Sequence, residues 1–410
     1  MHSVTSGSGH LRRNAVGQTA EIFDVSSERA SREVRDYLRE LRPALQLTQK
    51  ELSHASETLP TPISREFIAN LETSGLPGTV RKFLSYAWLT GADLQLLAEL
   101  AVAGSYEVEP GLSIDQLIGA CRRMVESGQH REALALARSA AREASGEGTS
   151  EPGRVGSLLI AASIAAKQGG FWRVQRELAE EAYCASEKSK DSAARALVLI
   201  ASALDSLGRE RLAVEFLDLI DKSSLDADPA LAAAYWGQKC ILLWRTEEFQ
   251  EAISAADRSL ALLREAEDEV QLALVLSVKS HILVEVGDLD GACLLAMRAL
   301  ESLEASGERG AVRRTVLCDV ARVETLSGNL DSAARLLHES RELALESGHE
   351  LHVFEARVGL CRLAHAQGNY GERDRLARLL RLSAPRVGYD PIRRRDYERL
   401  LDEMHQGGIR

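Results

Sequence analysis

The sequence predicts an all-α protein in which a short N-terminal domain precedes a solenoid of about seven helical hairpins. Composition is the first observation: 45% of the 410 residues are hydrophobic, only 5% are aromatic, and nine are proline. The abundant Ala, Leu, Glu and Arg favour helices, whereas the β-branched residues that favour strands are comparatively few. The second observation is a layout that recurs from about residue 112 to residue 382 with a period of about forty residues, which is typical of stacked helical hairpins.

Each repeat contains a turn between two expected helices. We place its first residue at Gly128, Gly169, Gly208, Glu247, Gly287, Gly328 and Gly368, at intervals of 39 to 41 residues. The residue seven positions earlier is always small: Cys121, Ala162, Ala201, Cys240, Ser280, Ala321 and Cys361. Small side chains let two antiparallel helices approach closely. Three of the six cysteines stand in this small-residue column, so we expect them to be packing residues.

Two further columns follow the same period. Five positions after the turn begins stand Ala133, Val174, Ala213, Ala252, Ala292, Ala333 and Arg373, and eleven before it stand Leu117, Leu158, Leu197, Trp236, Leu276, Leu317 and Arg357. These patterns resemble the tetratricopeptide repeat (TPR), in a form with longer loops than its usual unit of about 34 residues. The resemblance implies a right-handed α-solenoid domain over residues 106–382. The arginines of the last unit are expected in a polar capping repeat, and residues 383–410 are expected to be a C-terminal capping helix and tail.

Charge separates the two parts of the chain. Residues 1–100 hold 11 basic and 12 acidic side chains and the remainder holds 39 and 49, so the net charge of −11 lies mostly in the C-terminal part. The acidity therefore does not argue against nucleic-acid binding at the front of the chain. It does argue against a nucleic-acid surface on the repeats.

Several classes of protein are excluded by missing motifs. The six cysteines form no Cys-x-x-Cys pair, which argues against zinc ribbons and a secreted disulfide framework and for the cytoplasm. No apolar run approaches the roughly 18 residues that a membrane span needs, and the start lacks a signal pattern. The phosphate-binding Gly-x-x-x-x-Gly-Lys-Ser/Thr, Gly-x-Ser-x-Gly and His-Glu-x-x-His motifs do not occur. We therefore expect no enzyme, cofactor, metal or membrane partner.

The N-terminal segment predicts a small helical domain at residues 28–105, after a polar, Gly- and Ser-rich tail at residues 1–27. Thr48 followed by Glu51 is a capping box that starts one helix. Pro60 and Pro62 end any helix before them, and Ser64 can cap the next helix, SREFIANLE. In that helix the apolar Phe67, Ile68 and Leu71 form an inward face, so that Arg65, Glu66, Ala69 and Asn70 point outward.

This segment resembles the Xre/Cro-type helix-turn-helix family over residues 32–100. Leu47-Thr48-Gln49, Glu51-Leu52, Ser64, Ile68, Leu71 and Glu72 carry the likeness. It implies that Gln49 docks a phosphate and that Arg65, Glu66 and Asn70 face the major groove. The full DNA-binding set we expect is Gln49, Lys50, Ser64, Arg65, Glu66, Asn70, Arg81 and Lys82. The turn carries about five extra residues, and Gly75 comes one position late. Two alternatives stay open: helices that only cap the solenoid, and a module that has lost DNA binding.

In TPR solenoids the first helix of each hairpin lines a concave groove. Six positions before the turn stand Arg122, Ser163, Ser202, Ile241, His281, Arg322 and Arg362, and two before it stand Glu126, Lys167, Ser206, Arg245, Glu285, Leu326 and Ala366. From these columns and their neighbours we expect a ligand site made of Gln238, Trp244, Arg245, His281, Arg322 and Arg362. Arg245 and Arg322 could hold a carboxylate together, and Trp244 could supply apolar area. A solvated face with Trp244 as a packing residue is the alternative.

An Xre-type module followed by TPR hairpins resembles the RRNPP family of peptide-responsive bacterial regulators. The resemblance implies a cytoplasmic homodimer that binds double-stranded DNA. It also implies that a short signalling peptide enters the groove and changes the spacing of the two modules, as in quorum sensing. The solenoid departs from the family in having only Asn329 and Asn369, both in turns. The alternative is a protein-interaction adaptor in which the front module is structural or constitutively DNA-bound.

Overall fold

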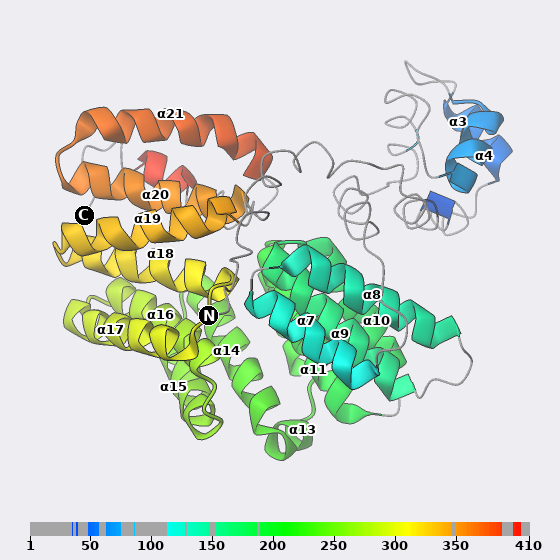
Figure 1. The fold of residues 1–410 in the computed structure, drawn as a ribbon, viewed down its shortest axis with the longest axis horizontal. Coiled ribbons are helices and arrows are strands. Elements are labelled where there is room, and N and C mark those ends of the chain that lie inside the picture. Colours follow the sequence, from blue (N-terminus) through cyan, green and yellow to red (C-terminus); the bar gives the residue numbers. More distant parts are fainter. Residues whose placement is uncertain are drawn as a thin grey trace, which may run out of the picture. The chain divides into compact units, whose positions relative to one another are not determined.

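A computed structural model describes residues 48–56, 63–74, 113–127, 129–146, 152–186, 189–346, 350–387 and 397–402, with Arg35, Leu38, Arg39 and Tyr86. The chain divides into two compact units, Met1–Glu107 and Val108–Arg410. The described residues are helical and contain no strand, which confirms the all-α prediction (Figure 1). Arg81, Lys82, Gly75, the predicted turn residue Gly128 and the expected tail at residues 1–27 lie outside the described residues.

The second unit is a TPR-like solenoid of seven helical hairpins, as predicted. They are α7 (Ile114–Glu126) with α8 (His130–Gly146), α9 (Pro152–Gly169) with α10 (Trp172–Ala185), α11 (Lys190–Ser206) with α12 (Glu210–Asp218), α14 (Pro229–Arg245) with α15 (Phe249–Glu265), α16 (Glu269–Glu285) with α17 (Leu289–Ser306), α18 (Ala311–Leu326) with α19 (Leu330–Glu346), and α20 (Glu350–Ala366) with α21 (Tyr370–Val387). The short α13 (Lys222–Ala227) follows α12, and α21 continues past residue 382, where we expected the repeats to end. Among the described helices, none combines the length and the apolarity that crossing a bilayer requires.

The small-residue column lies where each pair of helices meets. Its seven members are at most 1% exposed: Cys121, Ala162, Ala201, Cys240, Ser280, Ala321 and Cys361. The Sγ of Cys121 donates to the backbone oxygen of Ala133 at 3.5 Å, so this thiol serves the contact between α7 and α8. Burial raises the pKa of the Cys240 thiol to about 12. A thiol that stays protonated is a poor nucleophile, which agrees with the predicted packing role.

The turns between the paired helices use left-handed backbone. Gly208, Gly287, Gly328 and Gly368 have φ of 69°, 86°, 81° and 69°. The next residue bonds back to the helix end, as in Arg209 N to Leu204 O at 2.8 Å and Asn329 N to Glu324 O at 2.9 Å. This bonding satisfies carbonyls that the helix leaves without partners.

In the second hairpin the predicted turn is wrong by one residue. The left-handed residue there is Gly170, with φ of 77°, and α9 includes Gly169. Ser163 then occupies the position of Cys121, and its Oγ donates to the backbone oxygen of Gln175 at 2.9 Å. Ser163 is buried against α10 and does not face a groove. Two adjacent glycines are equally able to adopt positive φ, so the sequence could not choose between them.

One turn lacks a glycine, and this yields a first testable prediction. Glu247 has φ of 65°, a conformation that costs a residue with a Cβ about 1 kcal/mol or more. Glu247→Gly is therefore expected to raise the free energy of unfolding by about 1 kcal/mol. Gly287→Ala, where a Cβ would meet nothing within 4 Å, is expected to lower it by a similar amount. Denaturant titrations of both variants check this, and equal stability of the two would contradict it.

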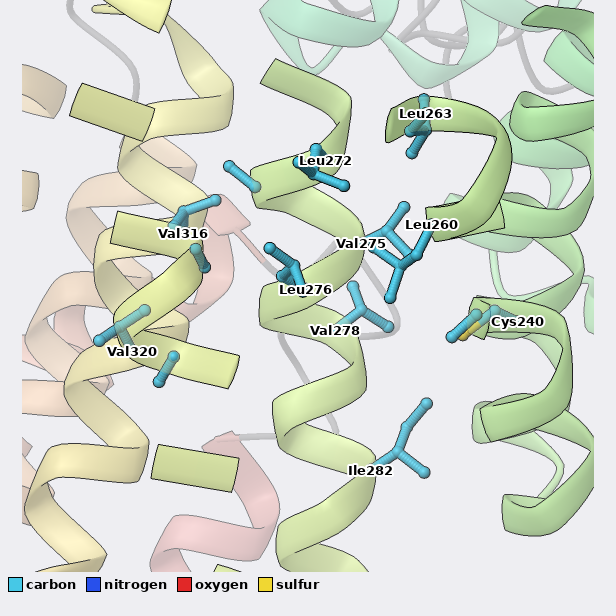
Figure 2. Close-up of a cluster of buried hydrophobic side chains, with 14 of the residues drawn as sticks. Cys240, Leu260, Leu263, Leu272, Val275, Leu276, Val278, Ile282, Val316 and Val320 are labelled. Carbon is cyan, nitrogen blue, oxygen red and sulfur yellow. The ribbon is translucent and has the colours of Figure 1, made fainter. Parts of the chain in front are cut away.

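Figure 2 shows how one hairpin packs against its neighbours around α16. Leu276 of α16 is turned toward α18, which contributes Val316 and Val320 to the same cluster. Val275 of the same helix is turned the other way, toward Leu260 of α15. A helix that is apolar around its circumference must be covered on several sides. The apolar cluster around α16 therefore extends from α14 to α18 and joins three successive hairpins.

Candidate functional site

Both helices expected to meet DNA begin with the predicted caps. α3 (Gln49–Ala55) starts at Thr48, whose Oγ1 accepts from Glu51 N while Glu51 Oε2 accepts from Thr48 N at 2.7 Å. This hydrogen bonding lowers the pKa of Glu51. α4 (Arg65–Ser74) follows Ser64, whose Oγ accepts from Phe67 N at 3.1 Å. The capping box and the serine cap are therefore confirmed.

The long connection between α3 and α4 is closed by side chains. Ser53 Oγ donates to the backbone oxygen of Ile63 at 2.8 Å. Ser56 Oγ accepts from Ile63 N at 2.9 Å, and Ser56 and Ile63 are 0% and 2% exposed. The chain therefore leaves α3 at Ser56 and returns to the same point at Ile63. The two helices pack together, and Leu52, Ile68 and Leu71 are buried.

The outward face of α4 carries Arg65, Glu66 and Asn70, all exposed, and Lys50 is exposed on α3. Ser64 is exposed and serves as the cap. Gln49 is half-buried, and its Nε2 donates to Glu72 Oε2 at 2.9 Å. The amide that the family resemblance assigns to a phosphate is thus oriented by a carboxylate of α4. Roles in DNA binding remain predictions for all of these residues.

A cavity of about 440 Å³ lies in the second unit, lined chiefly by α16, α18 and α20. These are the first helices of three successive hairpins, and they pack side by side. Part of the wall is apolar, with Val284, Leu326, Phe354 and Val358. The charged side chains of the wall are Glu285, Asp319, Arg322, Glu355, Arg362 and Arg399. Volumes of this order, with mostly apolar walls and a few polar groups, are usual for small-ligand sites.

Two polar contacts join helices across the cavity wall. Glu285 Oε1 lies 3.1 Å from Arg322 Nη2, with the side chains 22% and 25% exposed. The Nε2 of His281 lies 3.1 Å from the backbone oxygen of Asp319. Because a carbonyl can only accept, Nε2 carries the proton and donates. The cavity therefore presents partly exposed side chains of both charges, on helices that the core holds in place.

A second charged cluster lies on earlier helices. Arg245 Nε of α14 lies 2.8 Å from Asp205 Oδ1 of α11, with side chains 15% and 7% exposed. Desolvation raises the pKa of Asp205, and the charge of Arg245 opposes that rise. Lys167 of α9 faces the same carboxylate, and its pKa is lowered by burial. Gln238, which is 5% exposed, also lowers the pKa of Asp205, by less than Arg245 does.

Of the six residues expected to bind a ligand, His281, Arg322 and Arg362 line the cavity. Arg245 and Arg322 do not form one carboxylate clamp, because each is paired with a carboxylate of its own. Trp244 is partly buried against the core, with its ring edge-on to His281 at 5.8 Å. The expected pairing fails because periodicity places a residue on a face but does not reveal its partner on the next helix.

Sequence reasoning left out acidic groups of the cavity. Glu285 stands in the column two residues before the turn, so the repeat period could have indicated it. Asp319 stands nine residues before the turn of its own hairpin, which is about two helical turns before that column. Arg399 lies beyond the last repeat, and no periodic signal points to it. Among the described residues, no group of His, Cys, Asp and Glu is arranged to hold a metal ion.

Comparisons with known proteins give low similarities. No family model matches the chain, and no curated protein matches it. The structure of Bacillus thuringiensis PlcR in complex with the peptide PapR7 and DNA is similar at 10% identity over 67% of this chain and 95% of that one, with a TM-score of 0.41. A Rap protein complexed with competence and sporulation factor is 12% identical over 92% and 99%, with a TM-score of 0.45. A Pyrococcus horikoshii signal-transduction ATPase with a TPR sensor is 14% identical over 92% and 60%, with a TM-score of 0.47. The function proposed below rests on this chain's own residues.

Proposed function

We propose that the chain is a DNA-binding transcription regulator whose solenoid binds a short signalling peptide. The observation that carries the proposal is the closed turn between α3 and α4, in which Ser53 and Ser56 bond to Ile63. A helix-turn-helix needs its second helix fixed at one angle to the first so that it can enter the major groove. The hydrogen bonds from Ser53 and Ser56 to Ile63 hold the two ends of this long turn together, which helps to fix the angle between α3 and α4.

The exposed face of α4 supports a reading helix. Arg65 and Asn70 are exposed, and these residue types can make paired hydrogen bonds with guanine and adenine edges. Lys50 adds a cation that can meet a phosphate. So few cations make a single module a weak binder, and we propose a homodimer, joined through the solenoid, that presents two modules to two half-sites.

The cavity between α16, α18 and α20 supports a peptide ligand. Its Glu285, Asp319 and Glu355 suit an amine, and its Arg362 suits a carboxylate. The apolar wall at Phe354 and Val358 suits side chains between the two ends. Peptide binding is proposed to change the solenoid and hence the spacing of the modules. The proposal places the protein in the cytoplasm and includes no catalytic step.

The second testable prediction concerns the reading helix. The full chain is used to enrich genomic DNA fragments at low salt, and affinity is then measured for the sequence selected. Arg65→Ala and Asn70→Ala are each expected to weaken binding by about 1–3 kcal/mol if they reach base edges. Sedimentation of the complex measures whether two chains occupy one DNA fragment.

A matched control is Arg211→Ala, which removes one exposed cation from α12 of the solenoid. It is expected to leave DNA affinity unchanged. If the Arg65→Ala, Asn70→Ala double variant binds as tightly as the wild type, α4 is not the reading helix. Failure of the wild type to enrich any sequence would favour the adaptor.

A further inference from the structure

A segment near the C-terminus lies across the cavity. We call residues 397–402 the C-terminal strap. Tyr397, 8% exposed, sets its ring edge-on to Phe354 of α20 at 5.6 Å. Arg399 Nη2 lies 3.7 Å from Glu285 Oε2 of α16. Because α18 packs between α16 and α20, a strap that reaches both must cross the face of α18.

The strap meets the cavity with two different kinds of group. Leu400 is 0% exposed and Tyr397 joins it in the apolar cluster that includes Phe354 and Val358. Arg399 lines the cavity itself and brings a guanidinium to the acidic side of the wall. Without the strap the wall holds three carboxylates, Glu285, Asp319 and Glu355, against two guanidiniums. The cation of Arg399 therefore balances the charge of the wall.

We propose that the strap is an internal ligand of the cavity, and that the molecule which displaces it carries a cation next to an aromatic or branched apolar group. The cation, a guanidinium or an ammonium, replaces Arg399 at Glu285. The apolar group replaces Tyr397 against Phe354. This inference rests on the proposed function, which identifies the cavity as the ligand site. It adds the chemistry of the ligand, and it makes the strap an autoinhibitory segment that the ligand displaces.

The charged contact of the strap is suited to exchange. The Arg399 side chain is 57% exposed, and exposed ion pairs contribute little stability. A helical segment of this length is not stable by itself in water. What favours the strap is its covalent attachment, which gives a tethered group an effective concentration on the order of millimolar. A free ligand must exceed that advantage through better contacts with the same wall.

The test uses the full chain and one defined probe, a fluorescent peptide with the sequence of residues 394–404, RRDYERLLDEM. In the Arg399→Glu protein the strap is repelled by Glu285, so the peptide is expected to bind at least about tenfold more tightly than to the wild type. Leu400→Ala is a second way to weaken the strap and is expected to act in the same direction. Circular dichroism and thermal unfolding establish that both variants are folded.

Charge exchange provides the matched control. A peptide carrying Arg399→Glu is expected not to bind the Arg399→Glu protein, and adding Glu285→Arg to that protein is expected to restore binding of this changed peptide. Equal binding of the unchanged peptide to wild type and both strap variants, or no binding to any of them, overturns the inference.

The peptide assay contains no DNA, so its result is independent of the DNA-binding measurement described above. Comparing the two results separates the two proposals. If the peptide binds as expected but never alters DNA affinity, the strap is an internal ligand and the regulator proposal fails in its effector part. If DNA binding depends on Arg65 and Asn70 while the peptide fails to compete with the strap, the regulator proposal stands and this inference is wrong.

Discussion

Replacing Arg245 with Ala is expected to lower the free energy of unfolding by about 3–5 kcal/mol, because it leaves Asp205 as a buried charge without its main partner. The two side chains are only 15% and 7% exposed, with Arg245 Nε 2.8 Å from Asp205 Oδ1. Loss of the guanidinium also removes its contact with the Trp244 ring, whose centroid is 5.6 Å away. Denaturant unfolding of the full chain measures the effect.

The same variant is expected to regain stability as the pH falls. Burial already raises the pKa of Asp205, and removing Arg245 removes the largest effect that opposes the rise. In the interval between the ordinary pKa of an aspartate and this raised value, the folded state binds more protons than the unfolded state. Stability then falls as the pH rises through that interval. The deficit of Arg245→Ala relative to wild type should therefore shrink toward acid pH.

Two further variants decide between a structural and a ligand role for Arg245. A triple variant, Arg245→Met with Asp205→Leu and Lys167→Met, removes the three charges that act on one another, and is expected to recover most of the lost stability. Arg322→Ala breaks a pair whose members are 25% and 22% exposed, so it is expected to cost about 1 kcal/mol or less. A stable Arg245→Ala protein with altered ligand response would contradict the structural role and return Arg245 to the ligand site.

The period of the repeats could be predicted from sequence because packing requires it at every hairpin. A small residue must stand where two helices touch, and so Cys121, Cys240 and Cys361 could be recognised as buried from their register alone. The caps at Thr48 and Ser64 could be predicted because a cap is a local contact, fixed by residues two or three positions apart. The second turn was missed because Gly169 and Gly170 differ in neither chemistry nor conformational freedom.

The polar partners of the cavity could be predicted only in part. A column identifies the face on which His281 and Arg322 lie, and both line the cavity. It does not show that Arg245 turns toward Asp205 of the preceding hairpin, since that depends on the rotation between neighbouring hairpins. Nor does any repeat extend to Arg399, whose place depends on where the chain returns after α21. These contacts join residues that no local pattern relates.

Another contact of this kind joins the first hairpin to the sixth. Arg314 of α18, 1% exposed, places Nη2 3.3 Å from Nε2 of His130 at the start of α8. A guanidinium can only donate, so Nε2 of His130 accepts. The loop before α18 is close to α7 as well: a Cβ on Gly310 would come 3.0 Å from the backbone oxygen of Val125. Glu308, 7% exposed, adds a carboxylate whose charge acts on Arg314. We call Arg314, His130 and Glu308 the polar seam.

Solenoids are usually held by contacts between neighbouring repeats, so the polar seam makes a definite prediction. Arg314→Ala is expected to lower the free energy of unfolding by about 3–5 kcal/mol, because it removes a fully buried side chain and the cation on which the charges of Glu308 and Glu355 act. Arg309→Ala, an exposed neighbour in the same loop, is the control and is expected to change stability by less than about 0.5 kcal/mol.

Hydrogen exchange locates the effect: α7 and α8 should lose protection together with α18, although about 180 residues separate them along the chain. Loss of protection confined to α18 and its adjacent hairpins would mean that the first hairpin is held by its sequence neighbours alone. Loss at both places would establish that the solenoid is closed on itself, so that a change at α18, which also lines the cavity, reaches the hairpin nearest the N-terminal unit in sequence.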